Sequence, residues 1–98
     1  MDIKISSVHF DADKKLINFI TKKVQKLGKF YDEIINAEVI LRVENTQDTE
    51  NKIAEIRLYI RGNDLFAKKQ SKSFEESTDN AIEALRQQIS KHKGKLRD

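Results

Sequence analysis

The residues of this sequence best suited to binding a ligand are lysines that recur between positions 14 and 29. This stretch, KKLINFITKKVQKLGK, holds six lysines and no acidic residue. Its apolar residues recur at three- and four-residue steps, which is the period of a helix with one buried face. At about 100° per residue, four of the lysines fall within an arc of roughly 60° on the opposite side of this helix. They are Lys15, Lys22, Lys26 and Lys29.

Such a lysine face is suited to contact with phosphate groups. Surface helices usually mix charges, because Glu/Lys pairs at four-residue spacing are stabilising and like charges repel each other. No acidic residue within the stretch compensates this repulsion, whereas an external polyanion would. Lysine is a point charge without a fixed fork of donors, so the pattern favours contact with phosphates over the reading of bases.

A second basic window lies near the C-terminal end of the sequence. Residues 84–97 hold five basic residues and no acid, namely Arg86, Lys91, Lys93, Lys95 and Arg97. A single run of charge is most often only a solvated helix face. Here two independent basic windows are both expected on the same side of the molecule. For such a pair, nucleic-acid binding and a solvated surface are about equally favoured.

The sequence contains little that supports other chemistry. His9 and His92 are the only histidines, and we expect His9 to pack at a strand end and His92 to be solvated or to face an anion. There is no Ser-His-Asp grouping, no Gly-rich phosphate loop and no metal-ligand spacing. Asp48 and Glu50 are expected in a solvated loop rather than in a cation site. We therefore expect a protein that is not an enzyme and that uses no cofactor and no metal.

Length and composition are those of one small domain. With 98 residues, of which 38% are hydrophobic and 36% charged, the chain can bury a modest core. The net charge is only +3, but it is unevenly spread, since residues 30–60 hold seven acids against three bases. The absence of cysteine fits a reducing compartment, and no segment has the length and apolarity of a signal peptide or a membrane span. We expect one cytoplasmic domain over residues 1–98, without a membrane partner.

The lysine helix is expected to follow a first strand at residues 2–10. The apolar alternation of that strand breaks near Ser6, which indicates a bulge. Asp11 or Asp13 can cap the helix, because a short acidic side chain accepts hydrogen bonds from the free N–H groups at a helix start. Gly28 is a candidate for the end of the helix.

Three further strands are expected. Residues 36–44 and 53–61 alternate apolar and polar side chains, which is typical of a sheet covered on one side only. A tight-turn signal at 62–64 leads to a fourth strand at about 65–72, whose lysines suit an exposed sheet edge. Tyr59 lies on the outer sheet face and could stack on a base, although a solvated strand tyrosine is the simpler interpretation.

A capping-box pattern from Ser73 to Glu76 opens the last helix, which is expected to fray at Gly94. The order of elements is therefore β-α-β-β-β-α. A right-handed crossover, together with a single apolar sheet face, puts both helices on the same side. The predicted fold class is α+β, a two-layer sandwich in which two helices cover one face of a four-stranded, mostly antiparallel sheet.

The end of the first helix, KLGKFY at 26–31, and the closing stretch AIEALRQQISKHKGKL at 81–96 are similar to sequences of a known family. With the length and the order of elements, they resemble the ribosome hibernation promoting factor / ribosome-associated inhibitor YfiA family, short type, over the whole chain. The resemblance implies a protein that sits on the small ribosomal subunit in slow growth. There it would occupy the mRNA channel and the tRNA decoding sites, block translation and protect idle ribosomes.

The resemblance also implies which residues contact RNA, because both helices of such proteins present basic residues to ribosomal RNA. Carried over by position, these are Lys22, Lys23, Lys26 and Lys29 on the first helix and Arg86, Lys91, Lys93 and Lys95 on the second, to which the lysine arc adds Lys15. The chain departs from the family at Glu75, where well-known members often have a tyrosine. Long members also carry a linker and a C-terminal dimerisation domain, so we expect no dedicated dimerisation domain here.

Two other functions stay open on the sequence alone. One is a generic double-stranded-RNA-binding module, whose order of elements is similar. The other is a protein-interaction regulator that acts through the acidic middle of the chain. Salt separates them, because phosphate contacts weaken steeply as salt rises, whereas an apolar protein interface barely responds.

Overall fold

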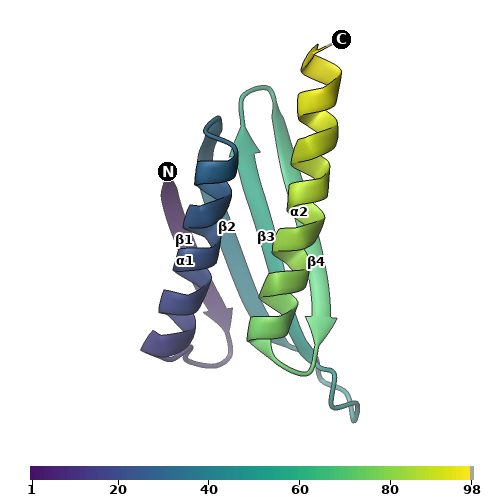
Figure 1. Ribbon diagram of the computed structural model, residues 1–98. Coiled ribbons are helices and arrows are strands. Elements are labelled where there is room, and N and C mark those ends of the chain that lie inside the picture. The colour runs from purple at the N-terminus through teal and green to yellow at the C-terminus, as the bar shows by residue number, and fades with distance from the viewer. Residues whose placement is uncertain (98) are drawn as a thin grey trace.

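The structure, a computed structural model, describes residues 1–97 and the side chains of residues 1–93. Its elements in chain order are β1 (Asp2–Val8), α1 (Lys14–Phe30), β2 (Ile34–Val43), β3 (Lys52–Ile60), β4 (Asn63–Ser71) and α2 (Phe74–Arg97). Figure 1 shows one sheet with both helices lying side by side on the same face of it. The predicted two-layer α+β sandwich is confirmed.

The sheet has the strand order β1-β2-β3-β4, so each strand pairs with its neighbour in the sequence. β1 and β2 are parallel, because α1 carries the chain back along the sheet between them, and the other two pairs are antiparallel. This confirms the mostly antiparallel sheet. Both helices start at the same end of the sheet and run in the same direction (Figure 1). The C-terminal half of α1 and the second basic window, in the C-terminal half of α2, therefore lie together at the other end.

The hydrophobic core lies between the sheet and the two helices. Alternate residues of β2 and β3 face it, and among these Val39 and Ile56 are completely buried. From the helices, Ile20, Val24 and Leu85 pack against them, also without exposed surface. The strand period of two and the helix period of 3.6 thus put the apolar residues in one layer and direct the helical lysines toward solvent.

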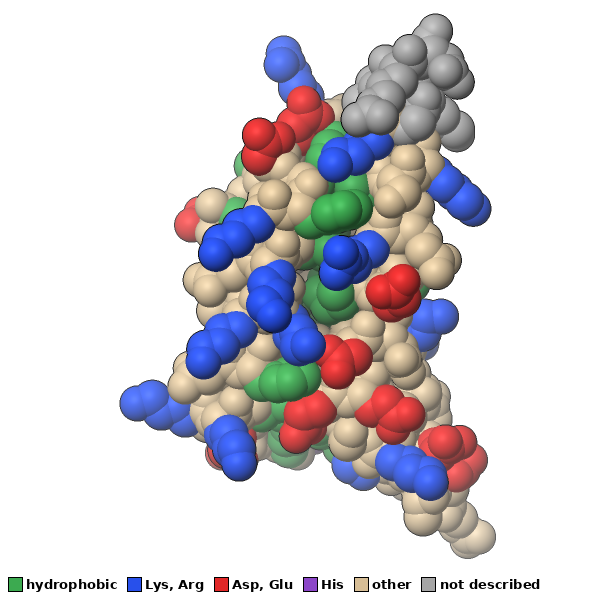
Figure 2. All heavy atoms as spheres, in the orientation of Figure 1, with side chains coloured by type: hydrophobic (Ala, Val, Ile, Leu, Met, Phe, Trp, Pro, Cys, Tyr) green, Lys and Arg blue, Asp and Glu red, His purple; other side chains and the backbone are tan. Residues whose placement is uncertain are grey.

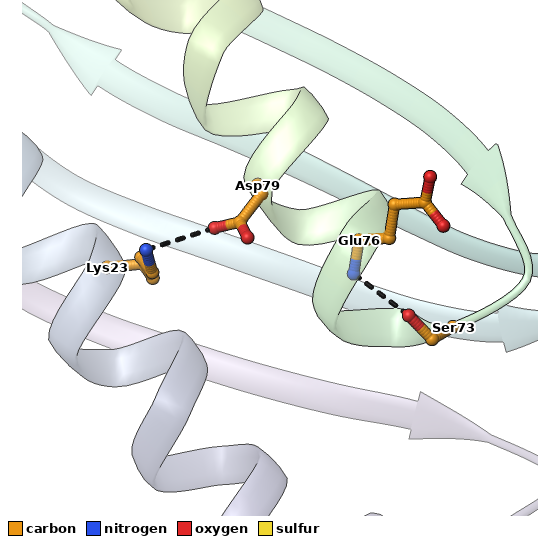
Figure 3. A network of polar contacts seen from close by, with 4 residues as sticks. All are labelled: Lys23, Ser73, Glu76 and Asp79. Carbon is orange, nitrogen blue, oxygen red and sulfur yellow. Dashed lines mark hydrogen bonds and ion pairs between the residues drawn. The ribbon is translucent and has the colours of Figure 1, made fainter.

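Side-chain caps define where both helices begin. Asp13 Oδ1 accepts a hydrogen bond at 2.8 Å from the backbone N–H three residues later, so Asp13 rather than Asp11 caps α1. At α2, Ser73 Oγ accepts from the N–H of Glu76 at 3.1 Å (Figure 3). The other half of the predicted capping box is replaced, because the N–H of Ser73 donates to Ser71 Oγ at 3.4 Å. Each cap satisfies an N–H group that has no partner within its helix.

The first strand differs from the prediction in three respects. β1 ends at Val8, and its register with β2 is unbroken, so the bulge predicted near Ser6 is wrong. The irregularity lies in β2 instead, where the register shifts between Ile34 and Asn36. His9 is exposed rather than packed, and its φ of 65° lies in the left-handed region. This conformation turns the chain sharply away from the strand direction before α1 begins.

Both helices run past the glycines that were predicted to end them. α1 continues for two residues beyond Gly28, and α2 continues beyond Gly94 to Arg97. Gly28 lies beneath the Met1 side chain instead, and a Cβ at this position would lie 2.6 Å from Met1 Cε, which would have to shift. A glycine inside a helix costs about 1 kcal/mol relative to alanine, which is too little to end a helix that tertiary contacts support.

Candidate nucleic-acid interface

Exposed cations cluster on the helical layer at the end where both helices finish. Figure 2 shows Lys and Arg side chains crowding α1 and the upper part of the groove between the helices. The exposed cations at this end are Lys22, Lys26, Lys29, Arg86 and Lys91, which together we call the cationic surface. Two segments far apart in the sequence form it, because the helices lie side by side and run in the same direction.

Three of these lysines border one hollow. Lys22, Lys26 and Lys29 line a hollow of about 560 Å³ together with Met1 and Asp32. Their spacing of four and three residues directs them to the same side of α1. Three ammonium groups thus face a single carboxylate, that of Asp32, and this excess of positive charge attracts anions.

Lys15 lies apart from the cationic surface. It is near the start of α1, at the opposite end of the helical layer, and borders a different hollow together with Asp11, Asp13 and Glu75. These carboxylates offset its charge. The structure therefore does not join Lys15 to the other lysines of the predicted arc.

The N-terminal half of α2 is acidic and limits the cationic surface. Acidic side chains gather over the lower part of α2 in Figure 2, and the sequence of this half contains Glu75, Glu76, Asp79 and Glu83. Asp79 Oδ1 pairs with Lys23 Nζ at 3.2 Å (Figure 3). The two side chains are 50% and 35% exposed, and exposed pairs are weak enough for the lysine to exchange its carboxylate for a phosphate. The cationic surface is therefore confined to the later turns of α1 and the C-terminal half of α2.

Lys93 contacts the end of α1. Its Nζ donates to the carbonyl of Phe30 at 3.2 Å, and lies 4.6 Å from the ring centroid of Phe30 and 5.7 Å from that of Tyr31. It thereby satisfies a free carbonyl and compensates the negative end of the helix dipole. Lys93 thus joins the two helices, a contact that the sequence did not reveal. The side chain of Lys95, also predicted to bind RNA, lies outside the described residues.

Aromatic rings beneath the cations are the feature that sequence reasoning missed. Arg86 Cζ lies 4.9 Å from the ring centroid of Phe30, and Lys23 Nζ lies 5.4 Å from that of Phe19. Such cation–π contacts hold a cation over the face of a ring. A signal was present in the sequence, because both phenylalanines are interleaved with lysines at the start and the end of the same helix.

Tyr31 and His92 pack against each other beside these rings. Their ring centroids are 6.1 Å apart in an edge-on arrangement. His92, predicted to be solvated or to face an anion, is half-buried. The Tyr31 hydroxyl donates to Glu33 Oε2 at 2.7 Å. Burial, and then the hydrogen bond and charge of Glu33, raise the pKa of Tyr31 to about 12. The hydroxyl is therefore neutral near pH 7 and adds no charge to the interface.

The opposite face of the sheet carries two ion pairs. Arg42 pairs with Glu55 at 2.9 Å, and Arg57 pairs with Asp64 at 3.7 Å. Tyr59 lies on this face, beside Asp64 in the strand register. Of the acids within residues 30–60, Glu55 is therefore compensated by an arginine on the neighbouring strand.

The predicted solvated loop between β2 and β3 is confirmed at Asp48 and Glu50. Both are exposed, and Asp48 Oδ1 accepts a hydrogen bond from the N–H of Glu50 at 3.0 Å within the loop. Within the described part of the chain, the His, Asp and Glu side chains form no group of three or more that could hold a metal ion. Neither helix, over the residues that the structure describes, is long and apolar enough to cross a membrane.

Comparison with known proteins yields matches over almost the whole chain. A family model described as "Sigma 54 modulation protein / S30EA ribosomal protein" matches residues 3–97. Curated proteins named ribosome hibernation promoting factor, from Klebsiella oxytoca and Escherichia coli (strain K12), are each 28% identical over 97 residues, which cover 99% of this chain and 98% of theirs. A solved structure of a ribosomal subunit interface protein from Coxiella burnetii has the same fold, with a TM-score of 0.85, 23% identity, and coverage of 96% of this chain and 99% of that one. These matches confirm the resemblance, and the chain belongs to the Sigma 54 modulation protein / S30EA ribosomal protein family.

Proposed function

We propose that this protein is a ribosome-associated translation inhibitor that acts by binding and has no catalytic activity. Its family and the name of its curated relatives, ribosome hibernation promoting factor, support an association with idle ribosomes. The single domain, residues 1–98, binds small-subunit ribosomal RNA through the basic faces of its two helices. It blocks the mRNA channel and the tRNA decoding sites in the cytoplasm, and needs no cofactor or small-molecule substrate.

The cationic surface is the observation that carries this proposal. It brings five exposed cations from α1 and α2 to one end of the helical layer, whereas the open face of the sheet pairs its arginines with carboxylates. Each phosphate contact releases about 0.7–0.9 of a counterion. Five contacts therefore correspond to a slope of about −3.5 to −4.5 when the logarithm of affinity is plotted against the logarithm of salt concentration.

Inhibition follows from occupied volume rather than from chemistry. The protein extends 47 × 24 × 19 Å along its principal axes. A rigid two-layer body of this size, held on the phosphates that line a channel, excludes mRNA and tRNA from the same space. Phosphate contacts supply much of the affinity, and the shape of the sandwich selects the site.

Co-sedimentation with purified ribosomal subunits across a salt series tests the proposal. We expect stoichiometric pelleting with the small subunit at low salt and its loss as salt rises. Lys22→Glu/Lys26→Glu should weaken pelleting, because two attractive phosphate contacts become repulsive, while both side chains are exposed and lie outside the core.

A matched control makes the same change of charge elsewhere. Lys69→Glu/Lys72→Glu alters two exposed lysines at the end of β4, on the other flank of α2, and should pellet like the wild type. Failure of the wild type to pellet even at low salt would refute the proposal. Unchanged pelleting of the Lys22→Glu/Lys26→Glu variant would show that α1 is not part of the interface.

A duplex-RNA-binding module is the second candidate, because a surface of lysines contacts phosphates of any RNA. Such a module would bind an isolated RNA duplex as tightly as it binds ribosomes. Excess duplex RNA would then abolish pelleting, whereas a ribosome-specific protein would resist this competition. A protein-interaction regulator that acts through the acidic middle is less favoured, because Glu55 of that stretch already pairs with Arg42.

A further inference from the structure

A hollow of about 480 Å³ lies where the end of α1 meets α2. Its lining consists of Phe30 from α1 and Glu83, Arg86, Gln87, Ser90 and Lys91 from α2. The residues from α2 recur at steps of three and four, so they project from one face of that helix. The volume of this hollow, which we call the Phe30 hollow, is within the range of about 300–1,000 Å³ that is typical of sites for small ligands.

The lining contains more than the cations that phosphate contact requires. Phe30 is half-buried, and the guanidinium of Arg86 lies over its ring while Arg86 itself is exposed to solvent. A guanidinium is planar and stacks on aromatic faces. Unpaired RNA bases stack both on aromatic side chains and on arginine planes. The Phe30–Arg86 pair is therefore a platform of the right kind for a base.

The platform is ordered before any ligand binds. Lys93 donates to the carbonyl of Phe30 and lies against the same ring, so α2 holds the last residue of α1 in place. A site that is already ordered loses less conformational entropy on binding. This order distinguishes the Phe30 hollow from a set of flexible lysines on an open helix face.

The polar groups of the hollow match the edge and the backbone of a nucleotide. The carboxylate of Glu83 accepts hydrogen bonds, and the amide of Gln87 both donates and accepts them, as base edges require. Lys91 lies one helical turn beyond Gln87 and suits a phosphate. Glu83 would repel a ligand composed only of phosphates, so a nucleotide fits this lining better than a free polyanion does.

We propose that the Phe30 hollow binds one unpaired nucleotide of RNA, with its base stacked on the Phe30–Arg86 pair, its base edge toward Glu83 and Gln87, and its phosphate at Lys91. This inference rests on the proposed RNA-binding function and adds a preference for single-stranded RNA. A base within a duplex has its faces covered by its neighbours and its edge paired, so it cannot enter the hollow.

A fluorescent reporter tests the stacking directly. The chain contains no tryptophan, so Phe30→Trp introduces a single indole at the platform. Stacking of a base quenches indole fluorescence. We expect quenching by a short single-stranded RNA oligonucleotide and none by an RNA duplex at equal occupancy, with occupancy measured independently by the anisotropy of labelled RNA.

Matched substitutions test the contribution of stacking to affinity. Phe30→Leu should weaken single-stranded RNA binding roughly 5- to 150-fold, which is the effect of losing one base–aromatic stack, and should leave duplex binding unchanged. Phe66→Leu makes the same change at another ring that lies beneath an arginine, Arg57, on the open face of the sheet and outside the hollow, and should alter neither affinity. Arg86→Lys keeps the charge but removes the plane, so it should also weaken single-stranded binding and provides a second test if Phe30→Leu does not fold.

Two results would overturn the inference. One is the absence of quenching at saturating single-stranded RNA, and the other is an equal loss of single-stranded affinity in Phe30→Leu and Phe66→Leu. Ribosome co-sedimentation distinguishes this failure from failure of the proposed function. Pelleting of Phe30→Trp without quenching by single-stranded RNA would refute only the nucleotide site, whereas a wild-type protein that does not pellet would refute ribosome binding itself.

Discussion

The geometry of the Lys23–Asp79 ion pair leads to a quantitative prediction for RNA binding. Its charged atoms are 3.2 Å apart on side chains that are 35% and 50% exposed. Two unit charges at this distance in water attract each other by about 1.3 kcal/mol, and exposed pairs contribute about 0.2–1 kcal/mol when measured. Lys23 must give up this energy before it can bind a phosphate. Asp79→Asn removes the competing carboxylate and should increase RNA affinity about 1.4- to 5-fold at low salt.

The anisotropy of labelled RNA, measured over a salt series, checks this prediction. The released lysine makes one further phosphate contact, so the plot of log affinity against log salt should steepen by about 0.7–0.9. Glu76→Gln is the matched control, because it removes the same charge from the same half of α2 on a side chain that points away from Lys23 (Figure 3). It should raise affinity less and leave the slope unchanged.

A double-mutant cycle tests whether Asp79→Asn acts by releasing Lys23, and it can refute this explanation. In a Lys23→Gln background, Asp79→Asn has no lysine to release and should have only the small effect of Glu76→Gln. An equal gain in both backgrounds would show that Asp79 acts by long-range repulsion and that Lys23 does not contact phosphate. Urea unfolding should accompany the cycle, and the loss of an exposed pair should lower the free energy of unfolding by no more than about 1 kcal/mol.

Three further predictions concern the folded state. Within the described part of the protein, buried Thr78 Oγ1 has no hydrogen-bond partner, so Thr78→Val should raise the free energy of unfolding in urea by about 1 kcal/mol, and a decrease would contradict this. His9→Gly should raise the melting temperature, because relief of about 1–2 kcal/mol of left-handed strain exceeds the entropic penalty of about 0.5–1 kcal/mol for glycine. A lowered melting temperature would show that His9 is unstrained. The pKa of Tyr31 is raised from 10.0 to about 12. The contribution of this shift to the free energy of unfolding should therefore be complete below pH 10. It should disappear between about pH 10 and 12, because only the folded state retains the proton there. Ultraviolet titration of tyrosinate in a Tyr59→Phe variant reads Tyr31 alone, and a transition near pH 10 would refute this assignment.

The arrangement of strands and helices was predictable because its signals are local and periodic. Residues two apart in a strand, or three and four apart in a helix, share a face whatever the rest of the chain does. Val39 and Ile20 lie at apolar positions of these two patterns, and both are completely buried. The errors at His9 and Gly28 have a different origin. A left-handed turn residue and a glycine under Met1 depend on where the chain goes next, which periodicity does not report.

The candidate site was predictable in part for the same reason. Helical spacing identified Lys22, Lys26 and Lys29 as exposed neighbours, and they border one hollow. It could not separate Lys15 from them, because that lysine shares their side of the helix but lies at the acidic end of the helical layer. Position along a helix decides which neighbours a charge meets, and those neighbours come from other elements.

The elements, their apolar faces and the outward direction of the lysines follow from local sequence, because each of these depends on residues a few positions apart. The partners of the cations depend instead on how the elements pack together. This packing puts Asp79 against Lys23, and it brings Lys93 to the carbonyl of Phe30, 63 residues away. These contacts depend on the common direction and close approach of α1 and α2. Both are set by the parallel β1–β2 crossover and by packing on one sheet, which act on the chain as a whole.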